Sequence, residues 1–413
     1  MRTDSRQDRI LHILPQFSCS GMGSRLLGLS REATRDFPQP EFLAWRGVGP
    51  WRQRFLQTAP TWAACDRTHD GTAWWRYGQI LRKIRPDLIH FWGGTNSRAI
   101  WLARQIVPGV QIIATCNQAT ELSQLDKRVP WPWARSYLPD EVAIESECLA
   151  ERYISSGQNI QRSAAFSVRV IPAAAPPRLD SAAANHQAHT EQRLLLRQKL
   201  NIPPTAPVLL TVGPLTAEKR IVELLWSLDQ VNCVLSEVYL LIVGEGPARD
   251  LISKYARLFH IDQRVRFLDY QPNLDPPLAA ADLYLTADPQ LGPKQAIMEA
   301  QDAGLPIIGH DQPELRRLCR PGVDAILCRS DMRAELAGAL YRLLSHPEKY
   351  AQLRAAASKI GGLPPRQQAW EAYAEGYSRL YKELLAVRTI PLHNQKSHVE
   401  GAYYRRAVRA PLK

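Results

Sequence analysis

Two charged residues of the second half, Lys219 and Glu299, have types and positions that would suit a ligand carrying phosphates and hydroxyls. Lys219 follows the apolar run 208–212 at the start of an expected helix, where a phosphate would meet free backbone N–H groups and an ammonium. Glu299 lies in an otherwise apolar helix start, and a carboxylate buried there needs donors such as the vicinal hydroxyls of a ribose. Lys219 also fits an ordinary solvated helix turn, and a loop backbone also offers donors to Glu299.

The first half contributes two glycines and a histidine. Gly21 and Gly23 fall in the small-residue loop 16–24, where they would let backbone amides approach a ligand. A tight turn without a ligand is the alternative interpretation of this loop. His90 lies in the short buried strand expected over 88–91, and we take it as a catalytic candidate.

Strands and helices must alternate to position these residues. In the first half, the apolar pattern predicts strands over 10–14, 88–91 and 111–115, and helices from about Arg25 and Ser97. In the second half, it predicts strands over 208–212, 238–243, 265–268 and 283–285, and helices over 218–231 and 295–303. Alternation of this kind builds parallel sheets with helices on both faces, so the fold class is α/β.

A change in composition divides the chain into two doubly wound domains. Residues 173–192 are poor in large apolar side chains and have no pattern, which is typical of a linker. The predicted parts are an N-terminal domain 8–175, a linker 176–192, a C-terminal domain 193–366, a helix 367–387 and a basic tail 388–413. The apolar face of the last helix would pack back across both halves or cap the second domain alone.

Composition excludes several classes of protein. Hydrophobic residues at 45% and charged residues at 22% are typical of a globular protein. No apolar run approaches the roughly 20 residues of a membrane span, and the N-terminus MRTDSRQDR is too polar for a secretory signal, so we expect a cytoplasmic protein. Seven cysteines without a C-x-x-C pair predict reduced thiols and no metal centre.

The net charge of +12 is unevenly distributed. The tail 388–413 has six Lys/Arg and one Glu, so it carries +5. We expect this tail to be disordered and solvated, the alternative being contact with a membrane or polyanion. The remaining charge is too dispersed to predict nucleic-acid binding. Nine of the eleven tryptophans lie in the first third, and 131–133 (WPW) has basic neighbours that suit a membrane interface or a carbohydrate platform, unless these rings pack under long loops.

Several segments, in order, resemble the family-4-type glycosyltransferases, the group 1 enzymes with the GT-B fold. In the second half these are VGPLTAEK, LLIVGEGP, RVRFLDY, AADLYLTADPQLG, IMEAQDAGLPII and GVDAILC. In the first half the match is looser, through ILHILPQFSCSGMGS, RPDLIHFWGG, IIATCNQ and RVIPAA. The resemblance covers residues 8 to 387 and implies two Rossmann-like domains that face each other across a crevice.

The resemblance implies a hexosyltransferase-type enzyme that moves a sugar from a UDP- or GDP-linked donor to an acceptor hydroxyl. Transfer would proceed with retention and without a metal or other cofactor. By position, Lys219 would hold the donor diphosphate and Glu299 the donor ribose, while the loops of Gly21, Gly23 and Gly292 would approach the donor. The expected acceptor is a sugar or a lipid-linked sugar, and the protein would contact the inner face of a membrane peripherally.

Three positions depart from the family pattern. Pro214 replaces an arginine beside the lysine, and Leu291 replaces a glutamate eight residues before Glu299. Asn117 replaces a histidine near the reaction centre, and it can form hydrogen bonds but cannot titrate near neutral pH. Asn117 is therefore the other catalytic candidate. Each of these three replacements would lose a contact worth about 1.5 to 4 kcal/mol. If no other residue replaced these contacts, the rate of transfer would fall by many powers of ten.

Nearby residues offer replacements for the lost contacts. Lys294 could face the diphosphate, and Asp288 or Gln290 could reach the sugar. The alternative function is that of a catalytically impaired GT-B homologue that binds a nucleotide or serves as a scaffold.

Overall fold

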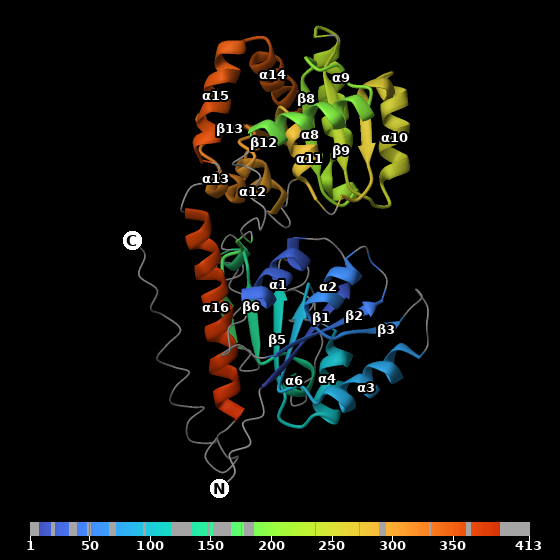
Figure 1. The fold of residues 1–413 in the computed structure, drawn as a ribbon, viewed down its shortest axis with the longest axis vertical. Coiled ribbons are helices and arrows are strands. Elements are labelled where there is room, and N and C mark those ends of the chain that lie inside the picture. Colours follow the sequence, from blue (N-terminus) through green and yellow to red (C-terminus); the bar gives the residue numbers. More distant parts are fainter. Residues whose placement is uncertain are drawn as a thin grey trace. The chain divides into compact units, whose positions relative to one another are not determined.

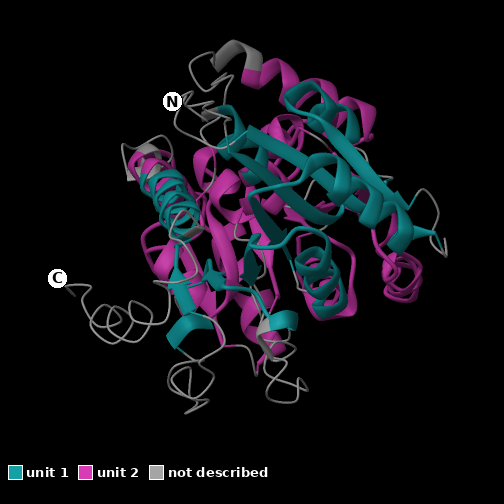
Figure 2. Cartoon of the chain, turned by 90° about the horizontal axis from the view of Figure 1, so that it is seen from below, with its two compact units in different colours: residues 1–18, 26–172, 372–413 teal, residues 19–25, 173–371 magenta. Residues whose placement is uncertain are grey.

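The chain divides into two compact units, which are described separately (Figure 2). Unit 1 comprises residues 1–18, 26–172 and 372–413, and unit 2 comprises residues 19–25 and 173–371. The computed structural model describes residues 8–17, 21–32, 39–47, 49, 51–65, 72–93, 96–116, 134–146, 149–151, 167–174, 176, 186–235, 237–271, 273–288, 295–329, 332–360 and 365–388. The predicted tail beyond Arg388 and the WPW segment 131–133 lie outside these ranges.

Unit 1 is built on a seven-stranded parallel sheet (Figure 1). Its strands are β1 (Arg9–Gln16), β2 (Gln39–Arg46), β3 (Thr61–Cys65), β4 (Leu88–Trp92), β5 (Gln111–Cys116), β6 (Glu141–Ile144) and β7 (Ser167–Val170). The spatial order is β3-β2-β1-β4-β5-β6-β7. The helices around it are the later part of α1 (Gly21–Glu32), α2 (Arg52–Thr58), α3 (Ala73–Ile84), α4 (Ser97–Ile106), α6 (Ala134–Tyr137) and the later part of α16 (Pro365–Arg388).

The two faces of this sheet bury different kinds of side chain. Because successive residues of a strand point to opposite faces, Leu11 and Ile89 pack on one face with the apolar sides of α3 and α4. His12 and His90, which are register partners on β1 and β4, lie on the other face, where α16 packs. One face is therefore a plain aliphatic core, and the other holds polar groups that need partners inside.

Unit 2 contains a six-stranded parallel sheet of order β10-β9-β8-β11-β12-β13. Its strands are β8 (Val208–Val212), β9 (Tyr239–Val243), β10 (Val265–Leu268), β11 (Leu283–Thr286), β12 (Ile307–His310) and β13 (Ala325–Cys328). Its helices are α8 (His186–Lys199), η2 (Ala217–Lys219), α9 (Ile221–Asn232), α10 (Arg249–Leu258), η3 (Asp262–Arg264), α11 (Asp275–Ala280), α12 (Gln295–Asp302), α13 (Pro313–Leu318), α14 (Arg333–Leu344), α15 (Pro347–Ile360) and the start of α16.

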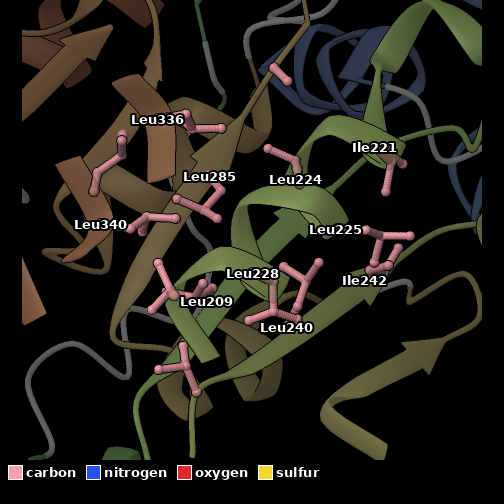
Figure 3. Packing of buried hydrophobic residues seen from close by; sticks show 14 of the residues in the cluster. Leu209, Ile221, Leu224, Leu225, Leu228, Leu240, Ile242, Leu285, Leu336 and Leu340 are labelled. Atoms are coloured by element: carbon pink, nitrogen blue, oxygen red, sulfur yellow. The ribbon is translucent and has the colours of Figure 1, made fainter. Parts of the chain in front are cut away.

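Both faces of the unit 2 sheet are covered by apolar helices, as the continuous apolar runs of its strands predict. Figure 3 shows one side of this core, where Leu224 and Leu228 of α9 and Leu340 of α14 meet Leu209 and Leu285 of the sheet. All five side chains are fully or almost fully buried. Burial of each contributes about 1.5 to 3 kcal/mol, so this core provides a rigid base for the loops at the strand ends.

Helix α8 begins at His186, inside the range predicted as linker. The sequence shows no apolar pattern there because arginines anchor this helix. Arg193 and Arg197 donate to Asp282 at 2.7 and 2.8 Å, and Arg197 also donates to the carbonyl oxygens of Ala206 and Ala280. Helix α1 likewise begins at Gly21 rather than near Arg25, so both predicted loop glycines belong to its first turn.

Within the described part of the chain, no helix is both long enough and apolar enough to cross a bilayer.

Candidate functional site

The strand order of unit 2 identifies the edge of the sheet at which a ligand can enter. From β8 the chain passes outward to β9 and β10, and it then returns to β11, on the other side of β8, before β12 and β13. The loops that leave β8 and β11 therefore turn to opposite faces and open a crevice at the carboxyl ends of these strands. Lys219 follows β8 and Asp288 follows β11.

A small pocket that is open to solvent lies at this switch point. Its lining comes from the end of β8 and the following loop, from the end of β11 and from the first turn of α12. Lys219 and Asp288 are the charged groups of the lining, and Pro214, Ala296 and Ile297 supply apolar surface. The pocket therefore combines one cation, one carboxylate and a wall that includes several apolar side chains.

Two glycines fix the shape of the loop that carries Lys219. A Cβ at Gly244 would overlap the carbonyl oxygen of Gly213, and a Cβ at Gly246 would overlap that of Leu215. The backbone N–H of Gly213 donates to Val243 at 3.0 Å, and that of Leu215 donates to Glu245 at 2.9 Å. The loops after β8 and β9 thus interlock by backbone contacts, and the glycines of the GEGP segment serve that packing.

Lys219 ends the short helix η2, and Arg220 then takes a left-handed conformation (φ +48°) before α9 begins. The continuous helix predicted over 218–231 is therefore broken at Arg220. The Lys219 ammonium donates to Asp288 Oδ2, with 22% of the lysine side chain and 5% of the aspartate side chain exposed. The cation predicted to hold a diphosphate is thus paired with a buried carboxylate of the same chain.

The neighbours of Asp288 hold it at the end of β11. The side-chain amide of Gln312 donates to the Asp288 carbonyl at 2.9 Å. Tyr284, two residues before the end of β11, donates its hydroxyl to the carbonyl of Val212 at 3.4 Å. Burial raises the pKa of Tyr284, and the negative charges of Asp288 and Glu299 raise it further. Tyr284 therefore stays a neutral hydroxyl in the floor of the pocket.

Glu299 lies on α12, three residues beyond the lining residue Ala296, and is partly buried. It accepts a hydrogen bond of 2.8 Å from the side-chain amide of Gln295. Ala296 and Ile297 of the same helix line the pocket, so Glu299 stands near it. The structure thus brings Lys219, Asp288 and Glu299 to one edge of one sheet. The predicted residues Gln290, Leu291, Gly292 and Lys294 lie outside the described residues.

The first-half candidates are distributed differently. Gly21 and Gly23 lie in the first turn of α1, which follows β1 in the chain, and they belong to the segment 19–25 of unit 2. The first N–H groups of a helix have no acceptor within the helix. Asn117 lies outside the described residues.

His90 is fully buried and both of its ring nitrogens have hydrogen-bonding partners. Its Nδ1 lies 2.7 Å from the Tyr381 hydroxyl and its Nε2 lies 2.6 Å from the Thr115 hydroxyl. Burial, followed by the charge of His12, lowers the pKa of His90 well below its ordinary value. A catalytic role requires a nitrogen that a substrate can reach, and this geometry instead makes His90 an internal contact for α16.

Some polar residues near the pocket carry no sequence signal that we recognised. His310, at the end of β12, lies 2.9 Å from the Glu223 carboxylate on α9, and both are buried. Gln312 follows them in the chain and holds Asp288. What these residues share is their position in the fold. Each lies at or near the carboxyl end of a buried strand, or in the first turn of a helix that packs there. Among the described residues, no three His, Cys, Asp or Glu side chains gather as metal ligands would.

Comparison with known sequences relates the chain to glycosyltransferases. Residues 206–346 match the family model described as glycosyl transferases group 1. The lipopolysaccharide core biosynthesis glycosyltransferase LpsE of Rhizobium meliloti (strain 1021) is 30% identical over 112 residues, 27% of this chain and 32% of that protein. The D-inositol 3-phosphate glycosyltransferase of Rhodococcus erythropolis (strain PR4 / NBRC 100887) is 26% identical over 312 residues, 71% of this chain and 66% of that protein. The matches therefore span from 32% to 66% of these two relatives.

Solved structures share the two-sheet architecture. The Anabaena protein Alr3699/HepE, crystallised with UDP and glucose, superimposes with a TM-score of 0.68 at 18% identity over 90% of this chain and all of that one. The lipopolysaccharide biosynthesis glycosyltransferase WaaG gives a TM-score of 0.67 at 14% identity over 88% of this chain and 98% of that one. At such identities the likeness establishes the fold, and the predicted pair of Rossmann-like domains is confirmed.

Proposed function

We propose that the chain is a group 1 glycosyltransferase of the GT-B fold, which transfers a sugar from a nucleotide diphosphate donor to an acceptor hydroxyl. The observation that carries this proposal is the pocket at the switch point between β8 and β11, which Lys219 lines, with the partly buried Glu299 on the helix α12 whose first turn also lines it. A diphosphate is bound by a cation such as Lys219, and the hydroxyls of a ribose are bound by a hydrogen-bond acceptor such as Glu299. Both groups lie at the same edge of one sheet.

In the proposed mechanism, Lys219 stabilises the diphosphate as its negative charge grows when the bond to the sugar breaks. Glu299 accepts hydrogen bonds from the ribose hydroxyls and so fixes the register of the donor. Tyr284 and the interlocked loops hold these groups in place, which supplies catalysis by proximity. The donor is a UDP- or GDP-linked hexose, transfer is retaining, and no metal takes part. These features extend the proposal beyond the family assignment.

The acceptor side of the proposal is assigned to unit 1. The acceptor is a sugar or a lipid-linked sugar, and the protein meets it on the cytoplasmic side by peripheral contact with the inner face of a membrane. The relatives support this class, since the name of one places it in lipopolysaccharide core biosynthesis and that of another describes transfer to an inositol phosphate.

A second candidate function is that of a homologue that retains nucleotide binding with impaired catalysis. The Lys219–Asp288 pair favours it, because an ammonium already neutralised by an internal carboxylate attracts a diphosphate less strongly. Pro214 in the pocket lining adds no charge to offset this. Donor turnover, measured with a panel of UDP-, GDP- and ADP-sugars, separates the two functions.

Calorimetric titration with free UDP and GDP tests the binding site. We expect Lys219→Ala to weaken affinity about tenfold to hundredfold, because it removes a charge-assisted contact worth about 1.5 to 3 kcal/mol. Glu299→Ala should weaken affinity by a similar factor. Lys254→Ala, which removes an exposed lysine from α10 of the same unit, is the matched control and should change nothing. Equal binding by wild type and Lys219→Ala would contradict this site, and absence of binding in all proteins would contradict both functions.

A further inference from the structure

The exposed tryptophans of the described residues all lie on two neighbouring helices of unit 1. Trp75 on α3 is 66% exposed, Trp74 beside it is 37% exposed, and Trp101 on α4 is 39% exposed. The other described tryptophans are buried or half-buried. The Trp74 ring lies 5.1 Å from that of Trp45 and the Trp101 ring stacks on Tyr137 at 6.2 Å, so these two are partly covered. Trp75 is left largely in water, and an exposed ring of this size calls for a partner that covers it.

Helices α3 and α4 present one continuous surface. They contact each other and lie side by side (Figure 1). Both cover the same face of the sheet, since Tyr77, Leu81 and Ile100 belong to one buried cluster with it. The residues on the outward sides of the two helices form what we call the α3–α4 face, namely Trp74, Trp75, Gln79, Arg82, Lys83, Arg98 and Trp101, all exposed. On α3, Trp75, Gln79 and Lys83 follow one another at intervals of four residues, so they lie along one side of the helix.

The α3–α4 face is positively charged. The two helices contain five basic residues and no Asp or Glu, three of the basic residues being in α3 and two in α4. Nearby carboxylates are engaged elsewhere: Asp140 pairs with Arg104, Asp87 accepts from the Arg9 backbone, and Glu41 accepts from the Trp62 indole at 2.8 Å. Lys83 lies over the Trp62 ring at 4.5 Å with its side chain exposed.

We propose that the α3–α4 face binds the surface of an anionic lipid bilayer. Tryptophan is suited to this boundary because its ring enters the headgroup region while its N–H remains hydrated. Arginine and lysine beside it pair with lipid phosphates, and the absence of acidic residues in both helices removes the repulsion that an anionic surface would otherwise meet. An acidic protein would be attracted by the same charges, but it would not account for the largely exposed indole ring of Trp75 beside them.

The inference names the surface for the membrane contact in the proposed function and rests on that part of it. It does not depend on transfer chemistry, because binding to vesicles needs no nucleotide. Failure of nucleotide binding would therefore leave this surface untouched, and failure of vesicle binding would leave the nucleotide site untouched.

The test is sedimentation of the full chain with vesicles of phosphatidylcholine, either alone or with about one third phosphatidylglycerol. We expect binding to the anionic vesicles, weakened by high salt because ions screen the charges. Arg82→Gln combined with Lys83→Gln should lower the apparent affinity about tenfold to thirtyfold, and Trp75→Ala about threefold to tenfold.

Matched controls lie on α10 of unit 2. Lys254→Gln combined with Arg257→Gln removes the same charge from exposed positions, and Leu258→Ala removes an apolar side chain that is 63% exposed. Both controls should bind like wild type. The proposal is overturned if wild type does not bind anionic vesicles or if the controls lose as much affinity as the α3–α4 variants. It is also overturned if the α3–α4 variants keep full affinity, which would place the contact elsewhere, such as in the basic tail 388–413.

Discussion

At the scale of single residues, the pairing of Lys219 with Asp288 has the most direct consequence for ligand binding. A lysine facing solvent would offer its whole charge to a diphosphate, but here a carboxylate that is only 5% exposed accepts from it. An incoming diphosphate must therefore share the ammonium with Asp288 and approach a negative charge in a partly dry site, where charges are poorly screened.

We predict that Asp288→Asn raises the affinity for UDP and GDP by about tenfold or more, because it removes the competing charge and keeps the size of the side chain. Calorimetric titration of both nucleotides measures the effect. Asp250→Asn, at an exposed position of α10, is the control for net charge and should leave affinity unchanged. Weaker binding by Asp288→Asn would instead show that this carboxylate contacts hydroxyls of the ligand.

At the scale of elements, α16 is attached to the sheet of unit 1 by a chain of buried hydrogen bonds. The Tyr377 hydroxyl donates to the Glu145 carboxylate at 3.3 Å and lies 3.0 Å from the Thr115 hydroxyl, which in turn lies 2.6 Å from His90 Nε2. Tyr381 closes the chain on His90 Nδ1. When each hydroxyl donates toward the Glu145 carboxylate, the proton of the neutral His90 ring lies on Nε2.

The same contacts predict how the stability of unit 1 depends on pH. Burial lowers the pKa of His12 to about 3 and also lowers that of His90, so in the folded state both remain neutral below the ordinary value of about 6.5. As the pH falls, the unfolded chain binds protons on these two histidines before the folded chain does. Their contribution to the free energy of unfolding is therefore fully present above about pH 6.5. Below that pH, the free energy of unfolding falls by about 1.4 kcal/mol per pH unit for each histidine.

Urea unfolding of unit 1, followed at several pH values between about 7 and 5, measures this slope. In His90→Gln the slope of the free energy of unfolding against pH should decrease by the contribution of one histidine, about 1.4 kcal/mol per pH unit. His346→Gln, which replaces an exposed histidine of unit 2, should leave the slope unchanged. A slope that does not respond to His90→Gln would mean that His90 does not remain neutral in the folded state.

At the scale of the whole molecule, the chain passes from unit 1 to unit 2 and returns to unit 1 through α16 at residue 372. The returning part of α16 brings Tyr373, Tyr377 and Tyr381, all almost fully buried, against the strands of unit 1. Unit 1 is therefore completed only by the last described element of the chain, whereas the sheet of unit 2 contains no segment from beyond residue 328.

We predict that deletion of residues 372–413 destabilises unit 1 by several kcal/mol, because three large side chains leave its interior and buried polar groups lose their partners. Hydrogen exchange followed by mass spectrometry should show faster exchange in β1, β4 and β5 and little change in β8 and β9. Deletion of residues 389–413 alone is the control and should have no such effect. Equal protection of unit 1 in both truncated chains would show that α16 is not part of its cooperative unit.

The sequence by itself determined the alternation of strands and helices, the division into two sheets and the positions of Lys219 and Glu299 on them, because buried strands and amphipathic helices have patterns that are local in the chain. It did not reveal that α8 starts within the predicted linker, because buried arginines rather than apolar residues anchor this helix. Only the tertiary structure decided that Asp288 neutralises Lys219 and that Tyr381 and Thr115 occupy both nitrogens of His90. These partners are 69, 291 and 25 residues apart, and contacts at such separations depend on the topology of the sheets, which no local pattern contains.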